Sequence, residues 1–83
     1  MPSSDFAHVT VVLPSLNPDE KLQKTVASLL AAGFTDLVLV NDGSRADTLR
    51  FFPKEDEHIT VLRHEVNRGK GAALKTAFRY VLE

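Results

Sequence analysis

The sequence predicts an α/β fold with a parallel sheet, because short apolar segments alternate with helical patterns along the chain. Residues 8–13, 37–40 and 59–62 are β-branched or otherwise apolar at nearly every position, which is typical of strands buried on both faces. A helical pattern follows each segment, and this alternation favours a parallel sheet with right-handed crossovers. The expected order is β-α-β-α-β-α.

The first strand is expected to break at Pro14, and a helix is expected soon after it. Asn17 is a good N-cap, Pro18 suits the first helical position, and Glu20 stands three residues after the cap. The apolar residues at helical spacing are Leu22, Val26, Leu29 and Leu30. Gly33 then supplies a left-handed stop.

After the second strand, residues 41–44 (NDGS) are turn residues. A short helix is expected over residues 47–52, with Asp47 as its cap and Pro53 as its stop. The third strand, residues 59–62, has room to extend toward His64.

Residues 67–71 form a loop that leads into the last helix. The apolar residues that share one face of this helix are Leu74, Ala77, Phe78 and Val81. A three-stranded sheet would leave long exposed edges, so we expect residues 1–83 to be a fragment of a larger α/β protein.

The composition is that of one small globular domain. The 83 residues are 43% hydrophobic and 25% charged with a net charge of −1, which excludes a disordered chain. Without an apolar run near ~20 residues or a secretory signal, we expect a cytoplasmic protein that reaches a membrane only through a longer parent. The absence of cysteine excludes disulfides, thiolate metal sites and a cysteine nucleophile. The charge balance gives no case for binding nucleic acid.

Polar and glycine residues gather where each strand ends, in residues 14–20, 41–45 and 67–71. In open α/β sheets, ligands bind beyond the carboxyl ends of the strands. Asp42 is a candidate acceptor for a nucleobase or a ribose hydroxyl, although turn chemistry alone also explains it. Lys70, between two glycines at a helix N-terminus, suits an anion, and a solvated lysine is the alternative.

Other motifs do not carry a function. Residues 69–74 lack the third glycine of a dinucleotide fingerprint and follow the third strand, whereas that fingerprint follows the first. A phosphate-binding Walker loop also fails, because the lysine precedes Gly71 and no serine or threonine follows. His8, His58 and His64 show no metal-ligand spacing, so they are interpreted as surface or strand residues.

Three segments share a pattern when they are considered together. They are residues 11–20 (VVLPSLNPDE), 37–44 (LVLVNDGS) and 67–74 (NRGKGAAL). In this order and at this spacing they resemble the opening of family 2 glycosyltransferases with the GT-A fold. Within that family, the chain looks most similar to dolichyl- or polyprenyl-phosphate sugar synthases.

The resemblance implies that residues 1–83 form a Rossmann-like, three-layer unit, the N-terminal nucleotide-binding half of a GT-A fold. The parent would transfer a sugar, with inversion, from a UDP- or GDP-linked donor to an acceptor, usually with Mg²⁺ or Mn²⁺. The residues with an implied role in nucleotide binding are Pro14, Leu16, Asp19, Glu20, Asp42 and Lys70. Asp42 would hold the base or ribose, Lys70 would lie near the base, and the backbone at Pro14 and Leu16 would line the nucleoside pocket.

The resemblance also implies what this chain lacks. The family's Asp-x-Asp metal motif, catalytic base and acceptor site belong beyond Glu83, so we expect no catalytic or metal-binding residue here and no transfer by residues 1–83 alone. The first strand would pair in the parent with a later strand, and its open edge therefore predicts self-association of the chain.

Two other functions are considered. A sugar-nucleotide pyrophosphorylase would carry a loop rich in glycine and arginine after the first strand, and residues 14–20 contain neither residue. A small non-catalytic α/β module that binds a nucleotide or another protein remains an open alternative.

Overall fold

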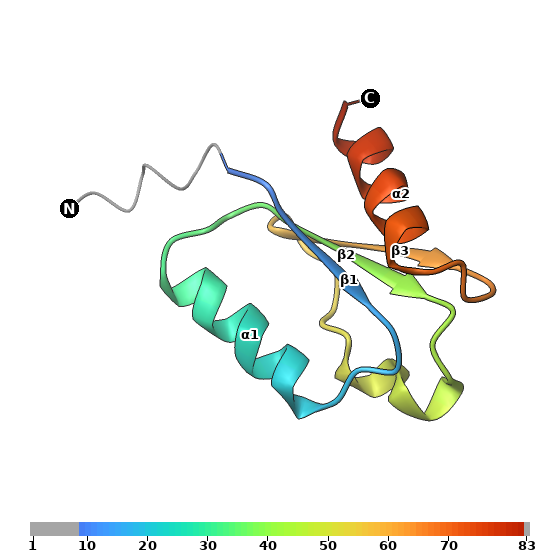
Figure 1. Ribbon diagram of the computed structural model, residues 1–83. Helices are drawn as coiled ribbons and strands as arrows, with labels where there is room; N and C mark the ends of the chain where they lie inside the picture. Colours follow the sequence, from blue (N-terminus) through green and yellow to red (C-terminus); the bar gives the residue numbers. More distant parts are fainter. Residues whose placement is uncertain (1–8, 83) are drawn as a thin grey trace.

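Three layers make up the computed structural model, which describes residues 9–82: a sheet with helical elements on both faces (Figure 1). The elements in chain order are β1 (Val11–Ser15), α1 (Glu20–Ala31), β2 (Leu37–Asp42), the 3-10 helix η2 (Ala46–Phe51), β3 (Ile59–His64) and α2 (Lys70–Leu82). The predicted α/β alternation is confirmed. Within the described residues, neither α-helix is long and apolar enough to cross a membrane.

The sheet is parallel, and β2 lies between β1 and β3. Leu37 is paired with Val11 on one side and with Ile59 on the other, and Asp42 is paired with His64. Because all three strands run in the same direction, the segments that follow them leave the sheet at one edge. We refer to this edge as the carboxyl edge.

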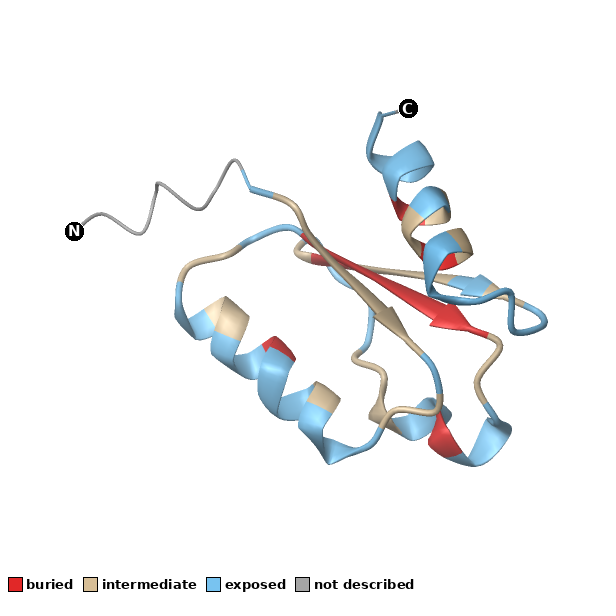
Figure 2. Ribbon diagram, in the orientation of Figure 1, coloured by how far each residue is buried: buried red, intermediate tan, exposed pale blue. Residues whose placement is uncertain are grey.

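The central strand β2 carries the core, since all of its residues are buried (Figure 2). The cluster between the sheet and α1 contains the buried residues Val26, Leu37, Leu39 and Ile59. The cluster between the sheet and α2 contains the buried residues Val38, Val40, Ala73 and Ala77. Each fully buried leucine or valine contributes about 1.5–3 kcal/mol relative to an exposed one, so β2 is the element on which both helical layers depend.

The first strand is placed later than predicted. It begins at Val11 and continues through Pro14, which does not break it; His8 lies outside the described residues. The N–H of Val11 donates to the carbonyl of Asp36 at 2.9 Å, and alternate residues of a strand face opposite sides. The nitrogen of Pro14 therefore faces away from β2, toward the outer edge of the sheet, where its missing N–H costs no bond in the ladder.

The second strand extends two residues beyond the predicted end, so Asn41 and Asp42 belong to the strand and are buried. The sequence predicted turn residues here, because asparagine and aspartate favour turns in isolation. Pairing with β3 overrides that local preference. The predicted extension of the third strand to His64 is confirmed.

The N-terminus of α1 also differs from the prediction. The cap is Asp19, whose carboxylate accepts the N–H of Lys21 at 2.9 Å, and the helix begins at Glu20. Asn17 instead has a left-handed φ of 49° and uses its side chain elsewhere. At the other end of α1, Gly33 has a φ of 104°, as the predicted stop requires.

The second and third helical elements differ in detail as well. The element predicted over residues 47–52 is a 3-10 helix from Ala46, and Asp47 is not its cap but pairs with Arg45 at 3.2 Å on the surface. In α2, Phe78 is 54% exposed, so the predicted apolar face is only in part the packed face. The small side chains of Ala73 and Ala77 are the ones that lie against the sheet.

Candidate functional site

A pocket of about 280 Å³ lies at the carboxyl edge of the sheet. Its lining residues come from the end of β1, the end of β2 and the loop that leads into α2: Pro14, Ser15, Leu16, Asp42, Asn67, Gly69 and Lys70. Pockets for small ligands usually measure about 300–1,000 Å³, so this one would enclose part of a nucleotide-sized ligand.

Four of the six residues singled out from the sequence line this pocket: Pro14, Leu16, Asp42 and Lys70. Asp19 and Glu20 do not, because they are exposed at the start of α1, where Asp19 serves as the cap. Ser15, Asn67 and Gly69 line the pocket without having been assigned an individual role from the sequence.

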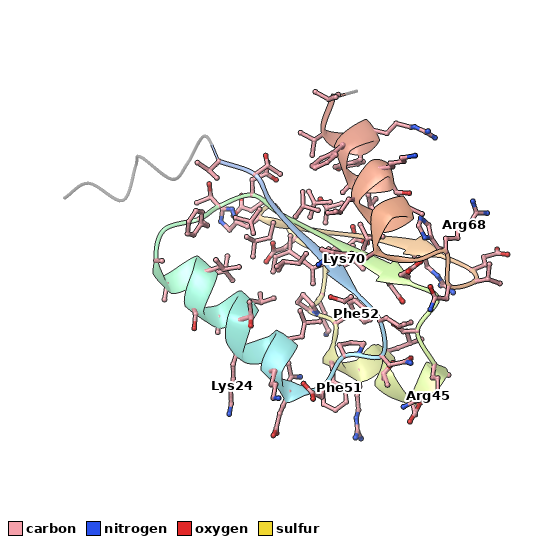
Figure 3. All side chains as sticks on the ribbon, in the orientation of Figure 1. Lys24, Arg45, Phe51, Phe52, Arg68 and Lys70 are labelled. Carbon is pink, nitrogen blue, oxygen red and sulfur yellow. The ribbon has the colours of Figure 1, made fainter. Side chains whose placement is uncertain are left out.

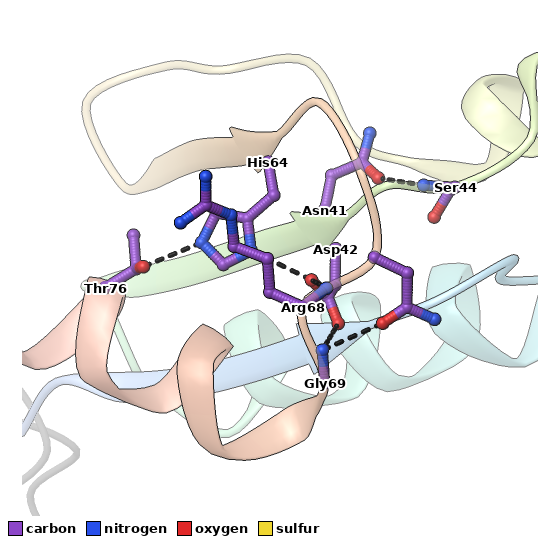
Figure 4. Close-up of polar contacts among 8 residues, drawn as sticks. Asn41, Asp42, Ser44, His64, Arg68, Gly69 and Thr76 are labelled. Atoms are coloured by element: carbon purple, nitrogen blue, oxygen red, sulfur yellow. Dashed lines mark hydrogen bonds and ion pairs between the residues drawn. The ribbon is translucent and has the colours of Figure 1, made fainter.

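Asp42 is the most constrained polar residue of the pocket (Figure 4). Its Oδ1 accepts the N–H of Arg68 at 2.9 Å and lies 2.8 Å from Nδ1 of His64, while its Oδ2 accepts the N–H of Gly69 at 3.0 Å. We call this set of bonds the carboxylate clasp. It ties the end of β2 to the loop before α2, so part of the pocket wall is held by the pocket's own carboxylate.

The same bonds set the charge of Asp42. The N–H of Arg68 lowers the pKa of the carboxyl below its ordinary value, burial opposes this, and the His64 ring and the N–H of Gly69 lower the pKa further. Hydrogen bonds to a carboxylate favour its charged form. Asp42 is therefore a buried anion at neutral pH.

His64 is the partner that sequence reasoning missed. Its side chain is 9% exposed, and its second ring nitrogen, Nε2, lies 2.7 Å from the hydroxyl oxygen of Thr76 in α2. Because an ionised carboxylate only accepts, Nδ1 carries a proton; when the ring is neutral, Nε2 then accepts from the Thr76 hydroxyl. The one signal in the sequence was that His64 ends the third strand, at the same edge of the sheet as Asp42.

The turn after Asp42 brings two backbone segments into close contact. Gly43 has a φ of 73°, and a Cβ on it would lie 2.3 Å from the nitrogen of Asn67 and 2.4 Å from the carbonyl carbon of Val66. Both the left-handed conformation and the space require glycine here. The loop before α2 therefore packs directly on the backbone of the turn.

A second set of bonds ties the loop after β1 to the turn after β2. Ser44 Oγ accepts the N–H of Asn17 at 2.9 Å, Asn17 Oδ1 accepts the N–H of Arg45 at 2.7 Å, and Asn41 Oδ1 accepts the N–H of Ser44 at 2.9 Å. We call this set the amide clasp. It fixes the chain next to Leu16, whose side chain is exposed and lines the pocket.

Lys70 brings a positive charge to the lining of the pocket. Lys70 and Arg68 are both exposed, and Figure 3 shows Arg68 at the periphery of the loop and Lys70 over the sheet in this view. Lys70 is also the first residue of α2. A cation at a helix N-terminus favours an anionic ligand, whereas the Asp42 carboxylate inside the pocket is suited to N–H or O–H donors.

A divalent metal has no site among residues 9–82. No group of three or more His, Asp or Glu side chains in this part of the chain could hold one. The residues present therefore do not fit the Mg²⁺ or Mn²⁺ that the resemblance implies, and we derive no step through a metal.

The chain matches a family of known proteins. The family described as Glycosyl transferase family 2 matches residues 10–83. The chain is 35% identical over 74 residues to an uncharacterized protein of Methanocaldococcus jannaschii, covering 89% of this chain and 30% of that protein. It is 31% identical over 87 residues to a dolichyl-phosphate beta-glucosyltransferase of Trichomonas vaginalis, covering 89% of this chain and 27% of that protein.

No solved structure was found that matches the chain significantly. The chain spans less than a third of the length of each of these two relatives. The family match, in contrast, covers nearly the whole chain and includes every residue of the pocket. The chain belongs to glycosyl transferase family 2.

Proposed function

We propose that this chain binds the nucleotide part of a nucleotide-sugar donor for a glycosyltransferase. The observation that carries the proposal is the pocket at the carboxyl edge, which brings Pro14, Leu16, Asp42 and Lys70 together from three separate segments. Ligands of open α/β sheets bind at this edge. Membership in glycosyl transferase family 2 supplies the class of ligand.

The pocket offers different chemistry to each part of a nucleotide. A carboxylate has about four lone-pair sites, and the carboxylate clasp uses two on Oδ1 and one on Oδ2 of Asp42. One site on Oδ2 is left for an N–H of the base or a hydroxyl of the ribose. Pro14 and Leu16 offer apolar surface to the base, and Lys70 supplies a cation at the same pocket.

The transfer itself is proposed for a longer protein. Because the two relatives are more than three times as long as the matched region, we propose that the acceptor site, the catalytic base and the metal ligands lie outside residues 1–83. The relative from Trichomonas vaginalis is a dolichyl-phosphate beta-glucosyltransferase. On that ground we propose inverting transfer of a hexose to a polyprenyl-phosphate acceptor, and binding without transfer by residues 1–83 alone.

Binding of UDP and GDP to the 15N-labelled chain tests the nucleotide proposal. We expect one of them to shift the amide signals of Leu16, Asp42 and Lys70, and Asp42→Ala to weaken that binding at least tenfold while the circular dichroism spectrum stays folded. Glu55→Gln, an exposed change of charge away from the pocket, is the matched control and should bind like the original chain. Shifts absent with both nucleotides would refute the proposal and favour a protein-interaction module.

Self-association stays a prediction of this proposal. Within residues 9–82, the outer edge of β1 is paired with no strand, and Val9, Tyr80 and Val81 are exposed large apolar residues. An open edge is a template for pairing with another chain. We expect the sedimentation coefficient to rise with concentration; a constant monomer value over a hundredfold range would contradict this.

A further inference from the structure

A buried polar chain lies behind Asp42, and the proposed nucleotide contacts do not use it. It runs from Thr76 in α2 through His64 at the end of β3 to Asp42 at the end of β2, with bonds of 2.7 and 2.8 Å (Figure 4). The Asp42 and His64 side chains are 5% and 9% exposed. The network of hydrogen bonds then continues from Asp42 to the N–H groups of Arg68 and Gly69 in the loop before α2.

Stability alone does not explain polar residues at these positions. The same face of the sheet is otherwise filled by apolar side chains such as Val40 and Leu62. Replacing both partners of a buried hydrogen bond by apolar groups of similar shape is often neutral or stabilising. Here every partner is satisfied: among the described residues, no buried side-chain nitrogen or oxygen lacks a hydrogen bond. This network of hydrogen bonds is therefore complete, and stability alone does not account for its ordered geometry.

Together with the backbone, these hydrogen-bonded residues form a closed ring. The loop of residues 65–69 leads directly from β3 into α2, and His64 and Thr76 flank that loop on either side. Asp42 holds the loop from the third side through Arg68 and Gly69. The carboxylate of Asp42 therefore lies between the ring of His64 on one side and the N–H groups of the pocket wall on the other.

We propose that His64, kept in a single tautomer by the carboxylate of Asp42 and completed by the hydroxyl of Thr76, is a positioning residue for the pocket. Its Nδ1–H holds the Asp42 carboxylate so that the two oxygens order Arg68 and Gly69 and one acceptor site on Oδ2 remains for a ligand. The carboxylate of Asp42 specifies the tautomer, because it only accepts, and the hydroxyl of Thr76 supplies the donor that the unprotonated Nε2 needs. The consequence for nucleotide affinity rests on the proposed function, whereas the ordering of the loop does not.

The tautomer can be measured on the unaltered chain. The 15N shifts of the His64 ring, recorded where the ring is neutral, should show Nδ1 protonated and Nε2 free. Thr76→Val removes the hydroxyl while keeping the shape, and should change the 15N shift of Nε2 while the proton stays on Nδ1, held by the Asp42 carboxylate. Thr76→Ser should restore the original shift of Nε2. A protonated Nε2 and a free Nδ1 in the unaltered chain would overturn the proposal whether or not any variant folds.

Two substitutions of His64 separate positioning from packing. The amide nitrogen of asparagine lies near the place of Nδ1, and that of glutamine near the place of Nε2. His64→Asn should therefore keep the donor to Asp42, whereas His64→Gln should lose it. We expect His64→Gln to exchange the amide proton of Arg68 at least tenfold faster, with His64→Asn close to the original rate. Gly69 should respond less, because its N–H also donates to Asn67 Oδ1 at 2.8 Å. His58→Gln, at the opposite edge of the sheet, is the matched control.

Nucleotide binding is measured with the same variants, using whichever of UDP and GDP binds the unaltered chain. His64→Gln should weaken binding about tenfold, the change that corresponds to the loss of one hydrogen bond to a charged group. If neither nucleotide binds but the exchange rates change as stated, the proposed function fails and the positioning role stands. Unchanged Arg68 and Gly69 exchange in His64→Gln would refute the positioning role, even with nucleotide bound.

Discussion

Each of the two clasps at the carboxyl edge ties a loop in place, but one uses a charged acceptor and the other uses neutral ones. The carboxylate clasp is buried and charged, and a single side chain, that of Asp42, accepts bonds from His64, Arg68 and Gly69. The amide clasp is neutral and partly exposed, and it spreads its bonds over Asn17, Asn41 and Ser44. A hydrogen bond to a charged group contributes about twice as much as one between neutral groups, so losing the acceptor of the carboxylate clasp costs more.

Because of this difference, the two walls of the pocket are held with different strength. The loop before α2 is held by a group that must stay ionised and fully bonded, so a change there affects both the fold and the site. The loop after β1 is held by bonds of ordinary strength, so the wall that carries Leu16 is the one with more freedom to adjust to a ligand.

Gly43→Ala should cause the largest loss of stability, about 2–4 kcal/mol in the free energy of unfolding. The added Cβ would collide with the backbone of Val66 and Asn67, which cannot move without breaking the carboxylate clasp. Gly71→Ala is the matched control, since a Cβ there meets nothing within 4 Å. In urea unfolding, we expect Gly71→Ala to be neutral or stabilising by up to about 1 kcal/mol. Equal losses for the two would contradict the close contact.

Asp42→Asn should follow, with a loss of about 2–3 kcal/mol. The amide nitrogen of asparagine cannot accept, so in one orientation it loses the donors of His64 and Arg68. In the other it loses the N–H of Gly69, which keeps a second acceptor in Asn67 Oδ1 at 2.8 Å. Asp47→Asn serves as the control, because the Arg45–Asp47 pair is exposed and its loss should stay within about 0.5 kcal/mol. A loss below 1 kcal/mol for Asp42→Asn would show that the carboxylate clasp is not held as described.

Acid should weaken the fold through the same carboxylate. The pKa of Asp42 is lowered from 3.8 in the folded chain, so the unfolded chain binds its proton first as the pH falls. Its contribution to stability is therefore complete above about pH 4–5 and is lost as the pH falls through the folded-state pKa. We expect urea unfolding to show that, between pH 5 and pH 2, the free energy of unfolding falls more steeply in the original chain than in Asp42→Asn. Parallel curves would contradict this contribution.

Asn17→Ala should give the smallest effect, about 1–2 kcal/mol, because it removes one hydrogen bond and leaves alanine at a φ of 49°. Asn17→Gly also removes the bond but tolerates this conformation, so it should be less destabilising by about 0.5–1 kcal/mol. Thermal unfolding of the two variants measures the difference. A more stable alanine variant would show that the left-handed conformation is not maintained.

Much of the fold was predictable from local patterns. Apolar runs of β-branched residues located all three strands, and the spacing of Leu22, Val26 and Leu29 located α1. Two errors concern the strands at the carboxyl edge: Pro14 continues β1, and Asn41 and Asp42 belong to β2 although a turn was predicted for them. In each case pairing with a neighbouring strand outweighed a local preference.

The sequence predicted which strand ends meet at the candidate site, but it did not predict the hydrogen bonds between their residues. Parallel strands bring their carboxyl ends together, and this placed Asp42 and Lys70 at one pocket. The link from Asp42 to His64 joins residues 22 apart, and the link from Asp42 to Gly69 joins residues 27 apart. No spacing rule reaches that far, because the distance depends on sheet register and on the path of a loop.

By itself, the sequence determined the α/β order, the helix stop at Gly33 and the gathering of polar residues at one edge, because all three follow from local conformation and periodicity. Only the tertiary structure decided that Asp42 is a buried anion held by His64 and by two loop amides. The physical reason is that a hydrogen bond between distant residues requires a register accurate to a fraction of an ångström. Chain-local preferences do not specify that accuracy, and packing on both faces of β2 does.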